Sequence, residues 1–145
     1  MAEEAGSPPA RYEWSLACPP DDVNTALDFL RTIWVSDTSV SAIDRAALET
    51  AVVEMTGNVI EHAAAGAAEA ECRIVVEIDP AVIRIEVRDD GASIDLDLDG
   101  SAMPDDTAES GRGIPMIRAL VDEFSYAREG DVNHWHLARS RTAAV

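Results

Sequence analysis

The sequence contains no lysine, because all 11 of its basic residues are arginine. A P-loop needs a lysine on the nucleotide phosphates, and the eukaryotic-type protein kinase fold needs one on a strand. Schiff-base chemistry also requires a lysine amine. The absence of lysine excludes all three. Any nucleotide site in this chain must therefore use backbone amides, a metal ion or arginine.

Long apolar runs and cysteine are scarce as well. No stretch reaches the roughly 18 apolar residues of a transmembrane helix. The N-terminal sequence MAEEAGSPPAR lacks the apolar core of a secretory signal. Cys18 and Cys72 fall in apparent strands, where buried thiols are a better interpretation than a disulfide. These features favour a cytoplasmic protein without membrane contact.

Positive charge is also in short supply. The chain has 28 acidic and 11 basic residues, for a net charge of −17. A nucleic-acid-binding protein needs a cationic surface for phosphates, so we expect no direct contact with nucleic acid. Solubility, attraction to a basic partner and adaptation to salt would each account for the excess, and the sequence leaves these causes open.

The length of 145 residues favours one domain, which we place at residues 11–140 between a flexible tail at 1–10 and a loose tail at 141–145. Periodicity predicts the order β-α-α-β-β-α-β-β. This order favours an α+β fold, a two-layer sandwich whose helices cover one face of a mixed, mainly antiparallel sheet. It argues against a Rossmann fold, which needs successive βαβ units.

The expected elements follow from alternation, caps and turns. We expect a mobile loop over 91–110 and a hairpin turn at Gly130-Asp131. The strands are expected at 12–18, 73–78, 82–88, 124–128 and 133–139, and the helices from a cap at Asp21 or Asp22 to Trp34, from Ser41 to Ala64 and from Gly113 to Asp122.

Smaller groups of residues favour structural roles. Ser41 and Asp44 have the spacing of a capping box. His134 and His136 share one face of a predicted strand, but no third ligand is evident, so ordinary histidines are a better interpretation than a metal site. We interpret the tryptophans as core and sheet packing, at positions Trp14, Trp34 and Trp135.

Glu54 and Asn58 lie four residues apart in the segment AVVEMTGNVIEHA. This spacing places them one turn apart on the same face of the predicted helix. Such a pair is often only a solvated helix face. It also suits chemistry, because an asparagine oxygen is a hard ligand for Mg²⁺ and a glutamate can accept a proton from a hydroxyl group or water.

Two glycine-bearing segments follow this helix. Asp89-Asp90-Gly91 ends a predicted strand. This segment is either an ordinary turn or a site where the Asp89 carboxylate accepts a hydrogen bond from the amine of a nucleotide base. Gly111-Arg112-Gly113 precedes a predicted helix. This segment is either a flexible boundary or a phosphate site made by the free amides at the helix N-terminus. Arg112 would add a charge-assisted contact to phosphate.

In their order and spacing, these three segments resemble the N, G1 and G2 boxes of the GHKL ATP-binding superfamily, which includes gyrases, chaperones and histidine kinases. The strongest segment is VVEMTGNVIEHA, supported by VRDDGASID and GRGIPMIRALVDEFSY. Over roughly residues 12–139, the short chain looks like the bacterial anti-sigma-factor serine-protein kinases. A histidine kinase proper would need a phosphoacceptor histidine on a preceding helix, and no histidine precedes His62.

The resemblance implies a Bergerat-type fold that binds ATP and Mg²⁺. Asn58 would hold the metal against the triphosphate, and Glu54 would act as general base on a serine or threonine hydroxyl of a partner protein. Asp89 would bind the adenine amine beside Gly91. The phosphates would lie under a lid from Ser93 to Ser110 that closes at Gly111 and Gly113.

The same resemblance implies protein partners. The family's substrate is an anti-anti-sigma protein of the STAS fold, a sigma factor is its alternative partner, and it generally forms a homodimer. The leading hypothesis is therefore an anti-sigma factor that is also an ATP-dependent serine-protein kinase. The alternatives are an ATP-gated binding switch with little or no kinase activity and an acidic adaptor that binds no nucleotide.

The chain departs from the family pattern at three places. Ser93 stands where a second glycine is usual, and Asn133-His134 stands where the last strand often begins with Gly-Thr. The expected lid is acidic and should repel a triphosphate, which predicts weak ATP affinity. Its acidic residues are Asp95, Asp97, Asp99, Asp105, Asp106 and Glu109.

Overall fold

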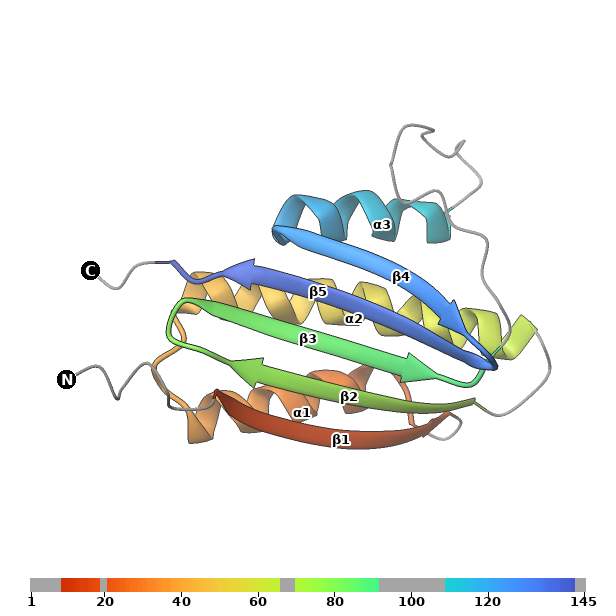
Figure 1. The fold of residues 1–145 in the computed structure, drawn as a ribbon, viewed down its shortest axis with the longest axis horizontal. Helices are drawn as coiled ribbons and strands as arrows, with labels where there is room; N and C mark the ends of the chain where they lie inside the picture. The colour runs from red at the N-terminus through yellow and green to blue at the C-terminus, as the bar shows by residue number, and fades with distance from the viewer. Residues whose placement is uncertain (1–8, 19–20, 66–69, 92–108, 143–145) are drawn as a thin grey trace.

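The computed structural model describes residues 9–18, 21–65, 70–91 and 109–142, and the side chains of all of these except 18, 62–65, 70 and 109–113. The described chain has the element order that the sequence predicts (Figure 1). The elements are β1 (Ala10–Cys18), α1 (Val23–Ser36), α2 (Ala42–Ala65), β2 (Ala70–Ile78), β3 (Val82–Asp89), α3 (Glu109–Leu120), β4 (Glu123–Glu129) and β5 (Val132–Ser140).

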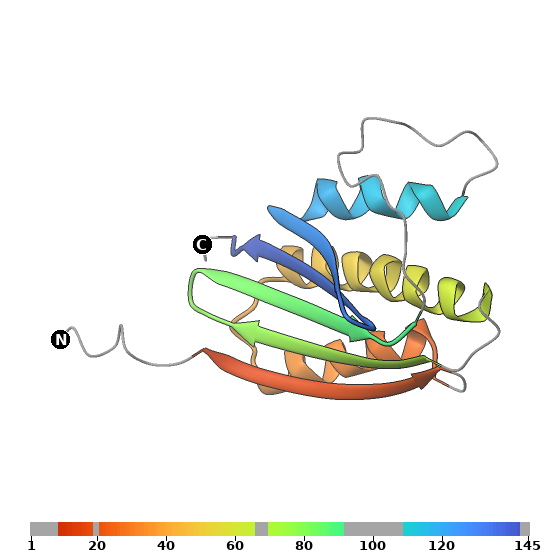
Figure 2. The same cartoon turned by 45° about the vertical axis from the view of Figure 1, so that its right-hand side comes forward.

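The strands form one sheet in the order β1-β2-β3-β5-β4, and the helices lie on one side of it (Figures 1 and 2). This arrangement confirms the α+β sandwich. Every pairing between the described strands is antiparallel, so the parallel component that we allowed for is not found among them. Short turns after β2 and β4 reverse the chain and impose this direction.

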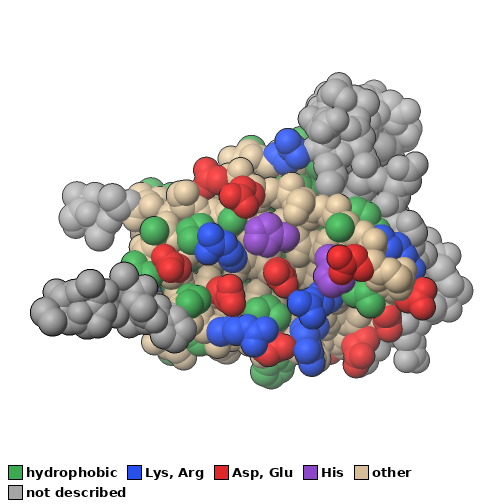
Figure 3. Space-filling view, in the orientation of Figure 1, with side chains coloured by type: hydrophobic (Ala, Val, Ile, Leu, Met, Phe, Trp, Pro, Cys, Tyr) green, Lys and Arg blue, Asp and Glu red, His purple; other side chains and the backbone are tan. Residues whose placement is uncertain are grey.

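One face of the sheet is apolar and the other is charged. The inward side chains of β3 are Ile83, Ile85 and Val87, and they are fully buried against the helices. The outward face is uncovered and carries arginine, glutamate and histidine side chains (Figure 3). Because strand side chains alternate between faces, this pattern fixes the register of the whole sheet. It also determines that Asp89, two residues beyond Val87, points toward the helices.

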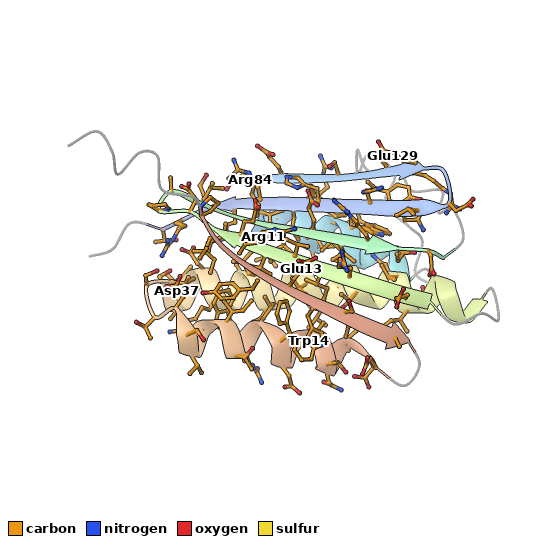
Figure 4. The ribbon with its side chains drawn as sticks, turned by 60° about the horizontal axis from the view of Figure 1, so that its bottom comes forward. Arg11, Glu13, Trp14, Asp37, Arg84 and Glu129 are labelled. Carbon is orange, nitrogen blue, oxygen red and sulfur yellow. The ribbon has the colours of Figure 1, made fainter. Side chains whose placement is uncertain are left out.

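The predicted packing roles are confirmed in part. Trp34 and Trp135 are buried, but Trp14 is 51% exposed, which corrects our prediction of a core residue. Trp14 lies on the edge strand β1, on the side of the strand that faces α1 (Figure 4). Its ring stacks on that of Phe29 of α1 with 5.8 Å between the ring centroids, so only one helix covers it. Cys72 is buried as expected, and the side chain of Cys18 lies outside the described part.

Asp22 is the residue that caps α1. Its carboxylate accepts hydrogen bonds from the backbone amides of Asn24 and Thr25, and the Thr25 hydroxyl accepts one from the Asp22 amide. This reciprocal pair is a capping box. At the second helix only one arm of the predicted box forms, from the Asp44 amide to the Ser41 hydroxyl. The Asp44 carboxylate is used elsewhere.

Asp44 ties the start of α2 to the end of the chain. Its side chain is 1% exposed and accepts from Arg139 Nε at 2.9 Å and from the amide and hydroxyl of Thr142, both at 2.8 Å. Arg141 also donates to the Asp79 and Ser39 carbonyls. Residues 141 and 142 are therefore anchored rather than loose, because a buried carboxylate needs donors. Residues 143–145 lie outside the described part.

None of the helices in the described ranges combines the length and the apolar character that are needed to cross a membrane. The longest of them, α2, carries charged residues such as Asp44 and Glu54 along its length.

We predict that Asp44 makes the fold sensitive to acid. Burial alone would raise the pKa of Asp44, but hydrogen bonds from Thr142, Arg139 and Ser41 outweigh it and lower the pKa below its ordinary value of 3.8. A lowered folded-state pKa stabilises the fold above that ordinary value, and the contribution is lost as pH falls through the folded pKa. Asp44→Asn should lower the free energy of unfolding by about 1.5–3 kcal/mol at pH 7, the range for hydrogen bonds to a charged group.

Urea denaturation from pH 7 down to pH 3 measures both effects. The difference between wild type and Asp44→Asn should shrink at acid pH. Asp28→Asn is the matched control, because Asp28 is exposed on α1 and its loss should change stability by less than about 0.5 kcal/mol. A gap between wild type and Asp44→Asn that stays constant down to pH 3 would contradict the assignment.

Candidate functional site

The predicted site residues come from elements that meet at one end of the molecule. The C-terminal half of α2, the end of β3, the start of α3 and the β4–β5 hairpin all lie at the right-hand end of Figure 1, and Figure 2 agrees. Asn58 lies in that half of α2, and Asp89 is the last residue of β3. The fold thus brings together segments that are well separated in sequence.

Asp89 is a buried carboxylate that is held by three donors. It is 4% exposed. Its Oδ1 accepts from the Gly91 amide at 2.8 Å and from Asn133 Nδ2 at 2.9 Å, and its Oδ2 accepts from Trp135 Nε1 at 2.9 Å. A carboxylate has about four acceptor positions. Among the described residues, one position on Oδ2 is therefore left for a further donor.

Gly91 allows this arrangement. A Cβ at position 91 would lie 3.0 Å from Asp89 Oδ1, closer than most real Cβ contacts. We predicted that Gly91 lets a ligand approach the backbone. The structure adds a reason from within the chain, because the missing side chain leaves room for the Asp89 carboxylate to accept from the Gly91 amide.

The β4–β5 hairpin supports Asp89 from behind. Asn133 lies directly opposite Asp89 in the register of β3 and β5. The oxygen of Asn133 accepts from Tyr126 Oη and from Arg128 Nη1 at 3.0 Å, and Arg128 Nη1 also donates to the Gly91 carbonyl at 2.8 Å. The hairpin turns at Gly130, whose φ of 60° suits glycine, where the sequence predicts it.

Sequence reasoning identified Asn133 only as a departure from a family pattern, and it missed the roles of Tyr126, Arg128 and Trp135. The available signal was the two-residue period of strands, which places Tyr126 with Arg128 and Asn133 with Trp135 on common faces. The pairing of those faces with Asp89 depends on the register between β3 and β5, which the sequence does not display.

Asn58 is buried and incompletely satisfied. Its side chain belongs to a residue that is 7% exposed, and its buried Nδ2 has no hydrogen-bond partner among the described residues. Such a group is costly in a folded core and points to a ligand. A carboxamide oxygen also fits Mg²⁺.

Glu54 lies one turn before Asn58 and is half-buried. The pair is therefore not the solvated helix face that we considered as the alternative. The Glu54 side chain is partly accessible to solvent, whereas Asn58 is buried. This gradient along α2 is compatible with a deep ligand contact at Asn58 and an open approach to Glu54.

The Gly111-Arg112-Gly113 segment lies inside α3 instead of before it, because α3 begins at Glu109. Pro115 accordingly falls beyond the first turn in which we placed it. Glycine can adopt helical geometry, and the buried residues Ile114 and Ile117 anchor α3 against the core. Residue 111 remains near the helix N-terminus, where backbone amides lack helical partners. The predicted lid residues 93–108 lie outside the described part, while Glu109 and Ser110 already belong to α3.

The histidines on β5 belong to the uncovered face of the sheet. His134 Nε2 lies 3.5 Å from Glu129, and His136 Nε2 lies 3.7 Å from Glu123. No group of three or more potential metal ligands of the His, Cys, Asp or Glu type occurs within residues 9–18, 21–65, 70–91 and 109–142.

Comparison with protein-family models matches residues 16–137 to the histidine kinase-like ATPase domain. The match extends from β1 to β5 and includes the segments around Asn58, Asp89 and Gly111. No curated protein matches the chain. The matched domain is of the GHKL type and implies ATP binding.

We predict that Asn58 is retained at a cost to stability. Asn58→Leu should raise the free energy of unfolding of the ligand-free chain by about 1 kcal/mol, because it removes a buried polar group that lacks a partner. Thr56→Val is the control on the same helix, since the buried Thr56 hydroxyl already donates to the Val52 carbonyl at 2.8 Å. That variant should gain nothing. Urea denaturation provides the measurement, and a loss of stability in Asn58→Leu would show that Asn58 has a structural partner.

Proposed function

Because the chain belongs to the histidine kinase-like ATPase domain family, we propose that it is an anti-sigma factor and an ATP-dependent serine-protein kinase. The observation that carries the nucleotide site is the unpartnered, buried amide of Asn58 at the same end of the sandwich as the Asp89 carboxylate. The carboxamide of Asn58 suits a metal–phosphate group and the carboxylate of Asp89 suits the adenine base, and both polar groups are otherwise costly to bury in a core.

Asp89 and Asn58 would bind opposite ends of ATP. The remaining acceptor position on Asp89 Oδ2 suits the exocyclic amine of adenine. The oxygen of Asn58 would hold Mg²⁺, and its Nδ2, unpartnered among the described residues, could donate to a phosphate oxygen. Magnesium, when bound, supplies the positive charge that a triphosphate needs in a chain with a net charge of −17. Residues 111–113, with Arg112, would contact the phosphates near the start of α3.

Glu54 would act as the general base. Its position one turn before Asn58 on α2 would bring its carboxylate beside the proposed phosphate position. It would take the proton of a serine or threonine hydroxyl while the hydroxyl oxygen forms a bond to the γ-phosphorus. The bond between that phosphorus and the bridging oxygen breaks, and ADP leaves with the electron pair.

The protein partners are proposed from the sequence resemblance. They are a STAS-domain anti-anti-sigma protein as substrate, a sigma factor as the alternative partner and a second copy of the chain in a homodimer, in the cytoplasm. An ATP-gated binding switch without kinase activity is the second candidate. The features that favour it are Ser93 and the acidic residues of the expected lid, which depart from the pattern of the active kinases.

We predict weak, magnesium-dependent ATP binding. Calorimetry should give a dissociation constant above the low micromolar range, because an acidic chain repels the triphosphate. Binding should disappear without Mg²⁺ and in Asn58→Ala. Asn24→Ala, at an exposed position on α1, is the control and should bind as wild type does. Failure of the wild type to bind any nucleotide would leave the nucleotide-free acidic adaptor.

We also predict that Glu54→Gln slows phosphoryl transfer to a STAS-domain protein by about 10²–10⁴-fold, the usual contribution of a general base. ATP affinity should stay within about threefold of wild type, because the substitution preserves size and removes only the base. Glu61→Gln, at an exposed position further along α2, is the matched control.

Radiolabelled phosphate transfer in a mixture of purified proteins measures this rate. An unchanged rate in Glu54→Gln would refute the assignment of the base. A wild type that binds ATP but does not phosphorylate the STAS protein would support the binding switch instead.

A further inference from the structure

Arg128 connects the β4–β5 hairpin to the end of β3. Its Nη1 donates to the Gly91 carbonyl at 2.8 Å and to Asn133 Oδ1 at 3.0 Å, and its Nε donates to the Gly130 carbonyl at 3.2 Å. One planar guanidinium therefore holds the hairpin turn, an inward-facing asparagine and the residue after the Asp89-Asp90 pair. This fixed fork geometry is a property that a lysine would not reproduce.

The contacts with Arg128 and with Asp89 together fix how the Asn133 amide is oriented. Arginine has only donors, so the group of Asn133 that faces it must be the oxygen. Tyr126 Oη donates to the same oxygen. The Nδ2 of Asn133 consequently faces Asp89 Oδ1 at 2.9 Å. A flipped amide would oppose its nitrogen to the guanidinium and its oxygen to the carboxylate, two repulsive contacts.

The orientation of Asn133 in turn limits what Asp89 can accept. Asn133 and the Gly91 amide occupy both acceptor positions of Asp89 Oδ1, and Trp135 occupies one of the two acceptor positions of Oδ2. The carboxylate cannot rotate without breaking these bonds, so it presents one acceptor position in one direction. A base with an exocyclic amine can donate to that position. A base with an oxo group there would oppose two acceptors and leave both unsatisfied.

We propose that Arg128 is a positioning residue that sets base selectivity through Asn133 and Asp89. This inference rests on the proposed nucleotide site, and it adds residues of the β4–β5 hairpin to it. Arg128 need not touch the nucleotide. It acts by fixing the amide of Asn133, which fixes the carboxylate that would read the base.

Selectivity between ATP and ITP tests the proposal, since the two differ at the base position in question, where hypoxanthine has an oxo group. Calorimetry on wild type should show a preference for ATP. Arg128→Met should reduce the ratio of the two affinities about tenfold, the size expected when a charge-assisted hydrogen bond is lost. The affinity for ATP should fall, and the affinity for ITP should stay within about threefold of its wild-type value.

Two variants separate positioning from general damage. Arg128→Lys keeps a donor and should recover part of the ATP preference. Arg84→Met removes an exposed arginine from the opposite face of β3 and should leave the ratio unchanged (Figure 4). Equal weakening of ATP and ITP in Arg128→Met would mean that Arg128 only stabilises the fold, and would overturn the selectivity role.

A second readout does not depend on nucleotide. The indole N–H of Trp135 donates to Asp89 Oδ2, so its resonance in a ¹H–¹⁵N spectrum reports the carboxylate position. Trp135→Phe assigns that resonance. We expect it to move in Arg128→Met and to stay in place in Arg84→Met. An unmoved resonance would overturn the positioning role. Absence of nucleotide binding by wild type would refute the proposed function and the selectivity role. The Trp135 indole resonance would still show whether Arg128 positions Asp89.

Discussion

A buried carboxylate must find hydrogen-bond donors, and this constraint organises both ends of the sandwich. Asp44 and Asp89 are each less than a tenth exposed, and both lie between the helices and the sheet. Asp44 draws the end of β5 and residue 142 onto the start of α2. Asp89 draws the β4–β5 hairpin onto the end of β3. The desolvation cost of an isolated carboxylate makes each set of contacts obligatory.

Asn58 stands apart from these two aspartates. The aspartates are surrounded by donors, whereas Asn58 keeps a buried polar atom without a partner among the described residues. Folding alone would favour an apolar residue at that position. Native chains tend to break such rules where they bind ligands. The contrast within one core separates carboxylates that hold the fold from an amide nitrogen that the described residues leave without a partner.

The basic residues of this chain are all arginines, and several of them hold separate segments together. Arg128 donates to a side chain and to two backbone carbonyls, Arg139 bridges Asp44 and the Leu120 carbonyl, and Arg141 reaches both Asp79 and Ser39. Each of these arginines joins elements that are distant in sequence. A planar group with several donors can satisfy separate acceptors at once, which a lysine ammonium on a flexible stem does less well.

The sequence by itself determined the order of elements, the capping of α1, the glycine turn at Gly130 and the one-turn spacing of Glu54 and Asn58. These features depend on residues within a turn or two of one another, and local propensity and periodicity describe them. The identity of the family also follows from short segments in a fixed order. Local signals failed at the start of α3, where the packing of Ile114 and Ile117 outweighs the low helix propensity of two glycines.

Only the tertiary structure decided what surrounds Asp89 and which residues are enclosed. The side-chain partners of that carboxylate and of the Gly91 carbonyl lie 37 to 46 residues away in the chain, and they meet through the register of β3 with β5. Edge position likewise leaves Trp14 exposed, and the demand of Asp44 for donors anchors residue 142. Register, edges and buried charge are properties of the assembled sheet, so no local pattern in the sequence can display them.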